Sequence, residues 1–97
     1  MLLMATPEGR LKGEIRRFLS DSGAFWSNVQ GGPGSKPGDP DIVVCYKGLY
    51  IGLEAKSSDG RQSPIQKVRE KEILASGGIY RVVRSVEDVK EILKELD

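Results

Sequence analysis

The stretch from Asp41 to Glu54, DIVVCYKGLYIGLE, constrains the fold more than any other part of the sequence. Two runs rich in β-branched and aromatic residues flank the pair Lys-Gly at 47–48, which suits a two-residue hairpin turn because glycine adopts positive φ freely. With that turn, Ile42 pairs with Leu53, and the next pair outward is Asp41 with Glu54. The sequence therefore predicts a β-hairpin with two opposed carboxylates on one face and a core-facing apolar surface on the other, made of Ile42, Val44, Leu49, Ile51 and Leu53.

The two opposed carboxylates predict a metal site. Like charges directly opposite one another destabilise a ladder, whereas a divalent cation between them makes the pair a set of ligands. Strand alternation places Lys56 on the same face as Glu54. With no histidine and one cysteine, zinc is close to excluded, and the oxygen ligands point to Mg²⁺ or Mn²⁺. Such an ion acidifies a bound water and neutralises phosphoryl charge, so we expect metal-assisted hydrolysis of a phosphodiester.

Each half of this pattern also has an ordinary explanation. A Glu-x-Lys on a strand is usually a solvated pair, and Pro-Asp is usually a turn. The hypothesis depends on the hairpin register, which brings Asp41, Glu54 and Lys56 to one face. A register displaced by one residue would separate them.

The remaining segments predict an α/β fold with the element order αβββαβα. Helix starts are expected at Thr6-Pro7, Ser63-Pro64 and Ser85, with glycines closing the first two helices at 23 and 77–78. Strands are expected at 24–30 and 79–84, and a glycine-rich loop at 31–38. The strand–helix–strand unit over 49–84 should be a right-handed crossover between parallel strands. We therefore predict a mixed four-stranded sheet flanked by helices.

Length and composition fit a single domain over residues 1–97. No run approaches the roughly 20 apolar residues of a membrane span. The opening Met-Leu-Leu-Met is too short for a signal-peptide core, so we expect a cytoplasmic protein with no membrane partner. Cys45 lies among apolar strand residues and is predicted to pack in the core. Charge is uneven: residues 86–97 hold five acids and two lysines, a net of −3, and the remaining 13 basic and 9 acidic residues give +4. This balance permits nucleic-acid binding.

A resemblance joins these features. Pro40-Asp41 followed by Glu54-Ala55-Lys56 resembles the signature of the PD-(D/E)xK nucleases, and the element order resembles their restriction-endonuclease-like αβββαβ core with an added C-terminal helix. The opening GDPDIVV, the glutamine of the next helix and the closing YRVVRS are similar to the VRR-NUC family, over nearly the whole chain. Its stand-alone members are often phage-encoded, which implies a bacterial or phage-infected host cell.

The resemblance implies roles for particular residues. Asp41 and Glu54 would bind the metal, helped by the Ala55 backbone carbonyl, and Lys56 would be the catalytic lysine. Gln66 matches the family's helix glutamine, which supports the lysine or the substrate. A capping box with Ser63 explains Gln66 equally well. Glu14 matches the acidic residue of the first helix, acting directly or through metal-bound water, although most helix glutamates are simply solvated.

The resemblance also implies a substrate. Stand-alone proteins of this kind are similar to homodimeric enzymes that resolve Holliday junctions, so we expect a structure-selective DNA endonuclease acting on branched DNA. A flap or single-strand nuclease and a non-catalytic DNA-binding subunit are the alternatives. Trp26 and Tyr80 are predicted to pack in the core rather than stack on bases, and Asp39 to be a turn residue. Basic side chains could contact phosphates or simply be solvated: Lys36, Arg16, Arg17, Arg61, Lys67 and Arg69.

Overall fold

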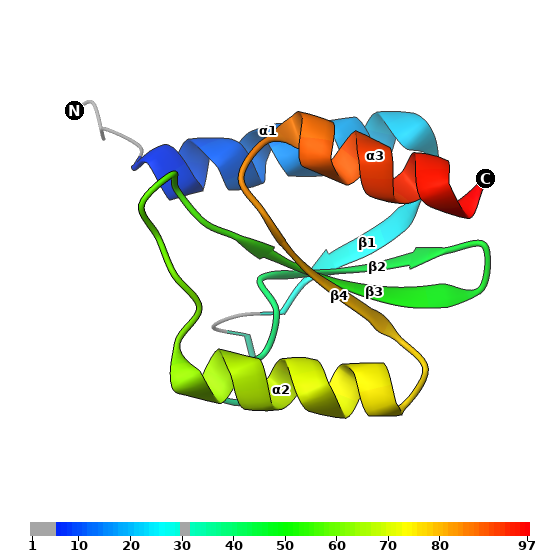
Figure 1. Cartoon of the computed structure of the whole chain (residues 1–97). Coiled ribbons are helices and arrows are strands. Elements are labelled where there is room, and N and C mark those ends of the chain that lie inside the picture. The colour runs from blue at the N-terminus through cyan, green and yellow to red at the C-terminus, as the bar shows by residue number, and fades with distance from the viewer. Residues whose placement is uncertain (1–5, 30–31) are drawn as a thin grey trace.

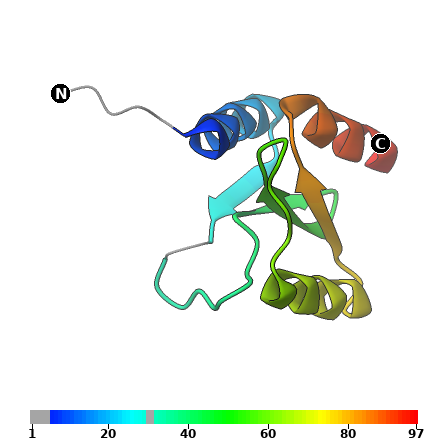
Figure 2. The same ribbon diagram turned by 60° about the vertical axis from the view of Figure 1, so that its left-hand side comes forward.

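The predicted hairpin forms the centre of a four-stranded mixed sheet in the computed structural model, which describes residues 6–29 and 32–97. The strand order is β1-β2-β3-β4, with β1 antiparallel to β2, β2 antiparallel to β3, and β3 parallel to β4. Helices α1 and α3 lie on one side of the sheet and α2 lies on the other (Figures 1 and 2). The elements are α1 (Pro7–Ser22), β1 (Phe25–Asn28), β2 (Ile42–Tyr46), β3 (Leu49–Ala55), α2 (Pro64–Ala75), β4 (Ile79–Val83) and α3 (Val86–Leu96).

The register of the hairpin is the predicted one. Ile42 pairs with Leu53, and Val44 pairs with Ile51. The turn residues Lys47 and Gly48 both have positive φ, 52° and 80°, as a two-residue hairpin turn with the twist of its strands requires. The α/β class, the element order and the parallel pairing of β3 with β4 are therefore confirmed.

Element ends differ slightly from the predictions. β1 covers Phe25–Asn28 within the predicted 24–30, and β4 ends at Val83, one residue early. Gln30 and Gly31, at the end of the predicted strand and the start of the predicted loop, lie outside the described residues, as do Met1–Met4. Thr6 caps α1 as predicted, with its Oγ1 accepting a hydrogen bond from the Gly9 N–H at 3.0 Å.

The side of the sheet facing α1 and α3 holds the aliphatic core. The side chains of β2 and β3 on this side meet one stripe of α1 and one stripe of α3. This burial of apolar surface is the main source of the fold's stability. The buried residues of this core are Leu11, Ile15, Leu19, Ile42, Val44, Ile51, Leu53, Ala55, Val83, Val89, Ile92 and Leu93.

The other side of the sheet is only partly covered. Cys45 is exposed there, so its predicted packing in the core is wrong. It alternates with the buried Val44 and therefore points away from α1 and α3, while α2 packs against β4 rather than over β2. Trp26 is half-buried and donates its indole N–H to Ser20 Oγ at 2.9 Å, and Tyr80 is buried.

Pro40 packs against Gly52 on the side of the sheet away from α1 and α3, and this contact positions Asp41. A Cβ added at Gly52 would lie 2.6 Å from Pro40 Cγ, so a larger side chain would displace the proline. Pro40 is fully buried. The close approach of this ring to β3 positions Asp41 at the point where β2 begins.

None of the described helices is long and apolar enough to cross a membrane.

Candidate active site

Asp41 and Glu54 lie side by side at one end of the hairpin, as the register predicts. Both are nearly inaccessible to solvent, with 4% and 2% of their surfaces exposed. Asp41 Oδ2 accepts a hydrogen bond from the Ala55 backbone N–H at 2.9 Å, and its carbonyl oxygen accepts one from the Val29 N–H at 3.0 Å. The Asp41 carboxylate is thus fixed to β3 and its backbone is fixed to the end of β1.

Three further side chains surround the Glu54 carboxylate. Gln66 Nε2, from the first turn of α2, donates to Glu54 Oε2 at 2.9 Å. The Tyr80 hydroxyl, from β4, donates to Glu54 Oε1 at 3.4 Å. Lys56 Nζ lies 3.9 Å from Glu54 Oε2, on the same face of the strand. The sequence prediction that Lys56 shares the face of the two carboxylates is therefore met in the structure.

Burial and the neighbouring charge act together on Glu54. Desolvation, and after it the repulsion of Asp41, raise the pKa of Glu54 to about 8, although Lys56 and Lys12 act in the opposite direction. Burial raises the pKa of Tyr80 to about 12, so its hydroxyl remains protonated and can donate to Glu54. Two buried carboxylates that repel one another in this way are stabilised by a proton or by a cation.

Gln66 has two functions, which the sequence presented as alternatives. Its Oε1 accepts from the Ser63 backbone N–H at 2.8 Å, and its own backbone N–H donates to Ser63 Oγ at 3.3 Å, which completes the capping box of α2. The other end of the same amide holds Glu54. Because one side chain does both, the start of α2 and the carboxylate are fixed relative to one another.

Lys12 belongs to this cluster and was missed by sequence reasoning. Its Nζ lies 3.4 Å from Asp41 Oδ1. At about 100° per residue, Lys12 flanks one edge of the buried stripe of Leu11 and Ile15, and Glu14 flanks the other edge. The hydrophobic stripe shows that two edges exist but does not indicate which one faces the hairpin.

The structure does not bring Glu14 to the carboxylates. Glu14 is exposed and, with Arg17, lines a hollow between α1 and α3 that also includes Lys90. The predicted role of Glu14 in holding a metal, directly or through water, therefore has no support from the geometry. Helical geometry is the physical reason, since Glu14 points about 200° away from Lys12 around the helix axis.

Of the basic side chains predicted to contact phosphates, some are exposed and others are engaged by protein groups. Lys36, Arg61 and Lys67 are exposed. Arg16 donates to Asn28 Oδ1 at 3.3 Å. Arg69 is engaged in holding the loop before β2, since its Nε lies 3.1 Å from Asp39 Oδ1 and its Nη2 donates to the Pro37 carbonyl at 2.8 Å. The sequence left open whether Arg69 contacts phosphate or is solvated, and in the structure its guanidinium instead holds this loop.

A second arginine holds the chain that follows Lys56. Arg84 Nη1 donates to the Ser57 carbonyl at 2.5 Å and to the Gly60 carbonyl at 2.8 Å. The Lys56 backbone N–H donates to the Val83 carbonyl at 3.0 Å. The end of β4 thus fixes both the lysine backbone and the turn after it. Arg84 is part of the YRVVRS segment quoted above, but its contacts are not evident from the sequence.

The donor set fits a hard divalent cation. No cluster of three or more Asp, Glu, His or Cys side chains occurs among residues 6–29 and 32–97, so the protein ligands would be the two carboxylates with the Ala55 backbone carbonyl. Mg²⁺ is commonly held by one or two carboxylates and keeps several waters. A cation there would also relieve the repulsion that raises the pKa of Glu54.

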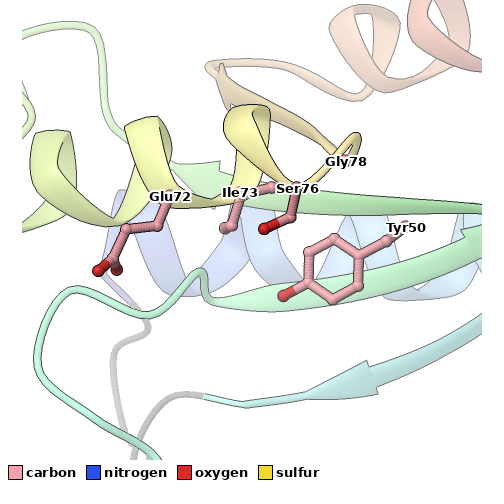
Figure 3. Close-up of a pocket in the computed structure, with 5 residues that line it drawn as sticks. All are labelled: Tyr50, Glu72, Ile73, Ser76 and Gly78. Carbon is pink, nitrogen blue, oxygen red and sulfur yellow. The ribbon is translucent and has the colours of Figure 1, made fainter.

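One hollow in the surface lies away from these residues. It has a volume of about 380 Å³ and is open to solvent beside the end of α2, where Tyr50, Ile73 and Gly78 line it (Figure 3). None of the residues around Asp41 and Glu54 contributes to it. The candidate active site is therefore defined by its buried charges, and a substrate would reach it from the surface.

Comparison with known proteins places the fold. No family model and no curated protein matches the sequence. A solved structure described as a VRR_NUC domain superimposes with a TM-score of 0.77 and 23% identity, covering 93% of this chain and 97% of the other. A second, described as a VRR_NUC domain protein, gives a TM-score of 0.71 and 17% identity, covering 96% and 89%. The chain therefore has the α/β fold of these VRR_NUC domains.

Proposed function

We propose that this protein is a divalent-cation-dependent DNA endonuclease that hydrolyses phosphodiester bonds. The observation that carries the proposal is the buried Asp41–Glu54 pair with Lys56 on the same face, in a fold shared with VRR_NUC domains. In a purely structural role, the two carboxylates would be buried and repel one another, and the neighbouring Lys12 and Lys56 offset only part of this cost, since the pKa of Glu54 is still raised to about 8. A non-catalytic DNA-binding subunit would not need them.

In the proposed mechanism, Asp41, Glu54 and the Ala55 carbonyl hold the cation, and Gln66 and Tyr80 fix the orientation of Glu54. Bound there, Mg²⁺ or Mn²⁺ would supply charge neutralisation at the phosphoryl group and a more acidic water. Lys56 would orient the attacking water and stabilise the additional negative charge of the transition state through its ammonium. Arg84 would keep the lysine in place by holding the turn after it.

The decisive experiment is cleavage by the purified protein. We expect cutting of branched DNA with Mg²⁺ or Mn²⁺, none with EDTA, and loss of cutting in Glu54→Ala and Lys56→Ala. Lys94→Met, an exposed change at the end of α3, serves as the matched control. Equal cutting by wild type and Glu54→Ala would overturn the proposal. A non-catalytic protein would bind DNA and never cut it.

We propose four-way junctions as the preferred substrate and a homodimer as the active form. A two-fold dimer would present two sites to a two-fold-symmetric junction. Comparing a four-way junction with a 5′ flap, single-stranded DNA, a nicked duplex and linear duplex separates this substrate from those of a flap or single-strand nuclease. Stronger cutting of the flap or of single strands would replace the junction in the proposal.

An exposed apolar row supports self-association. Phe25, Cys45 and Tyr50 are direct neighbours across β1, β2 and β3, on the side of the sheet away from α1 and α3. Phe25 is 74% exposed, and Tyr50, which lines the hollow of Figure 3, is 44% exposed. A second copy of the chain would cover this row. We expect Phe25→Glu to convert a dimer to a monomer in light scattering, and Val68→Glu, an exposed apolar position on α2, to leave it unchanged.

A further inference from the structure

Lys12 is a charged residue at the candidate site that the proposed mechanism does not use. Among the ion pairs of the described residues, its one partner is Asp41, with Nζ 3.4 Å from Oδ1. Its side chain is 27% exposed, whereas that of Asp41 is 3% exposed. The ammonium thus lies at the boundary between the buried carboxylates and solvent, where a substrate phosphate would arrive.

A purely structural role for Lys12 is weak. α1 is held to the sheet by Leu11, Ile15 and Leu19, which are buried in the core. The ion pair with the buried Asp41 offsets part of the desolvation of that carboxylate, and a divalent cation bound there would take over this compensation. Asp41 also keeps its orientation without Lys12, because its other oxygen accepts from the Ala55 N–H. The lysine side chain can therefore move away while the carboxylate stays in place.

The charges of the cluster show what the movement would accomplish. Asp41 and Glu54 are paired with Lys12 and Lys56, so the four groups sum to zero when all are ionised. A divalent cation on the two carboxylates neutralises them and repels both ammonium groups. Lys12 and Lys56 would then offer two positive charges to the approaching phosphodiester. Two ammonium groups suit a phosphodiester, because it carries one negative charge in the ground state and gains more in the transition state.

We infer that Lys12 is a phosphate-binding residue of this site, which rests on Asp41 and moves to a nonbridging oxygen of the DNA phosphate when a divalent cation binds. Glu8, one turn earlier on the same face of α1, lies beside Gly60, where an added Cβ would be 3.4 Å from its Oε2. It does not pair with Lys12 within the described structure. The ammonium of Lys12 is therefore available to the DNA once Asp41 is occupied.

The test compares Lys12→Met with wild type, with Lys94→Met as the control and Lys12→Arg as the conservative variant. DNA affinity is measured by anisotropy with Ca²⁺ over a range of salt, and Mg²⁺ affinity by calorimetry without DNA, above the pKa of Glu54. For Lys12→Met we expect DNA binding to weaken about tenfold and its salt slope to fall by about one. Mg²⁺ affinity should rise severalfold, because the cation no longer displaces an ammonium from Asp41.

One combined outcome supports the inference, and the others overturn it. Restoration of DNA affinity in Lys12→Arg, with Lys94→Met unchanged, supports it together with the shifts above. A Lys12→Met variant that loses only thermal stability, with wild-type salt slope and Mg²⁺ affinity, shows a structural lysine and overturns it. Lys12→Gln repeats the measurement if the methionine variant does not fold. The inference rests on the proposed function, so a wild type that neither binds Mg²⁺ nor cuts DNA overturns both, whereas a wild type that does so while Lys12→Met matches it overturns this inference alone.

Discussion

The two sides of the sheet are built on opposite principles although the same strands form them. The buried residues of the core between the sheet and α1 and α3 are all aliphatic, and they are held by close packing. The side under α2 buries Asp41, Glu54 and Gln66, and Gln66 is the one buried residue of α2. This helix leaves Ile65, Val68 and Leu74 exposed. Packing on one side of the sheet therefore stabilises the fold, whereas the burial of charged groups on the other side lowers its stability.

The largest effect that would test this comparison involves neighbouring residues on opposite sides of β3. Glu54→Gln keeps the shape and removes the charge, so we expect cleavage to fall by more than the roughly 10–100-fold typical of losing a group that hydrogen-bonds to a metal ligand. Its free energy of unfolding without metal at pH 8 should rise. Leu53→Ala should instead lose about 2–5 kcal/mol of stability and, at a temperature where it is folded, keep most of its activity.

Denaturant unfolding and cleavage assays on both variants check this prediction. A Glu54→Gln protein that is less stable than wild type at pH 8 would mean that the carboxylate contributes to the fold. The distinction between a stabilising side and a functional side would then fail.

The next effect concerns the amide that joins α2 to Glu54. Gln66→Leu removes the hydrogen bond to Glu54 and one half of the capping box, and we expect activity to fall about 10–100-fold. Ser63→Ala is the matched control, because it removes the side-chain cap and costs about 1 kcal/mol without touching Glu54. If both variants lost activity equally, Gln66 would act only through the helix start.

The sequence predicts the hairpin side of this comparison better than the helix side. The register followed from a two-residue turn and an alternating pattern, which together placed Asp41 beside Glu54. Lys12 and Glu14 could not be assigned in the same way, because both flank one apolar stripe of α1 and only packing decides which edge meets the hairpin. The position of Cys45 depended on how much of the sheet α2 covers, which no local pattern encodes.

A pH effect of about tenfold per unit is expected for the binding of Mg²⁺. The pKa of Glu54 is raised to about 8 from an ordinary value of 4.5, so below pH 8 the cation must displace a proton. Apparent Mg²⁺ affinity should therefore increase from about pH 6 to pH 8 and level off above it. Calorimetry in buffers of different ionisation enthalpy measures both the affinity and the released proton.

The same shift fixes the sign of the stability change. Because the folded pKa is above the unfolded one, the folded protein holds the proton more tightly, so stability without metal is highest below the unfolded pKa and falls as pH rises toward about 8. Glu54→Gln should remove this slope. A wild type whose metal-free stability rose between pH 5 and pH 8 would contradict the burial argument for Glu54.

The smallest effect tests whether the end of β4 contributes to the functional side. Arg84→Met removes the hydrogen bonds to the Ser57 and Gly60 carbonyls, so the turn after Lys56 gains freedom and we expect kcat to fall severalfold with little change in DNA affinity. Arg81→Met, in β4 three residues earlier, is the matched control, since it loses only an exposed pair with Glu95 and its free energy of unfolding should stay within about 0.5 kcal/mol of wild type. Single-turnover cleavage separates the two variants. An equal kcat in both would mean that the hydrogen bonds of Arg84 do not help to position Lys56.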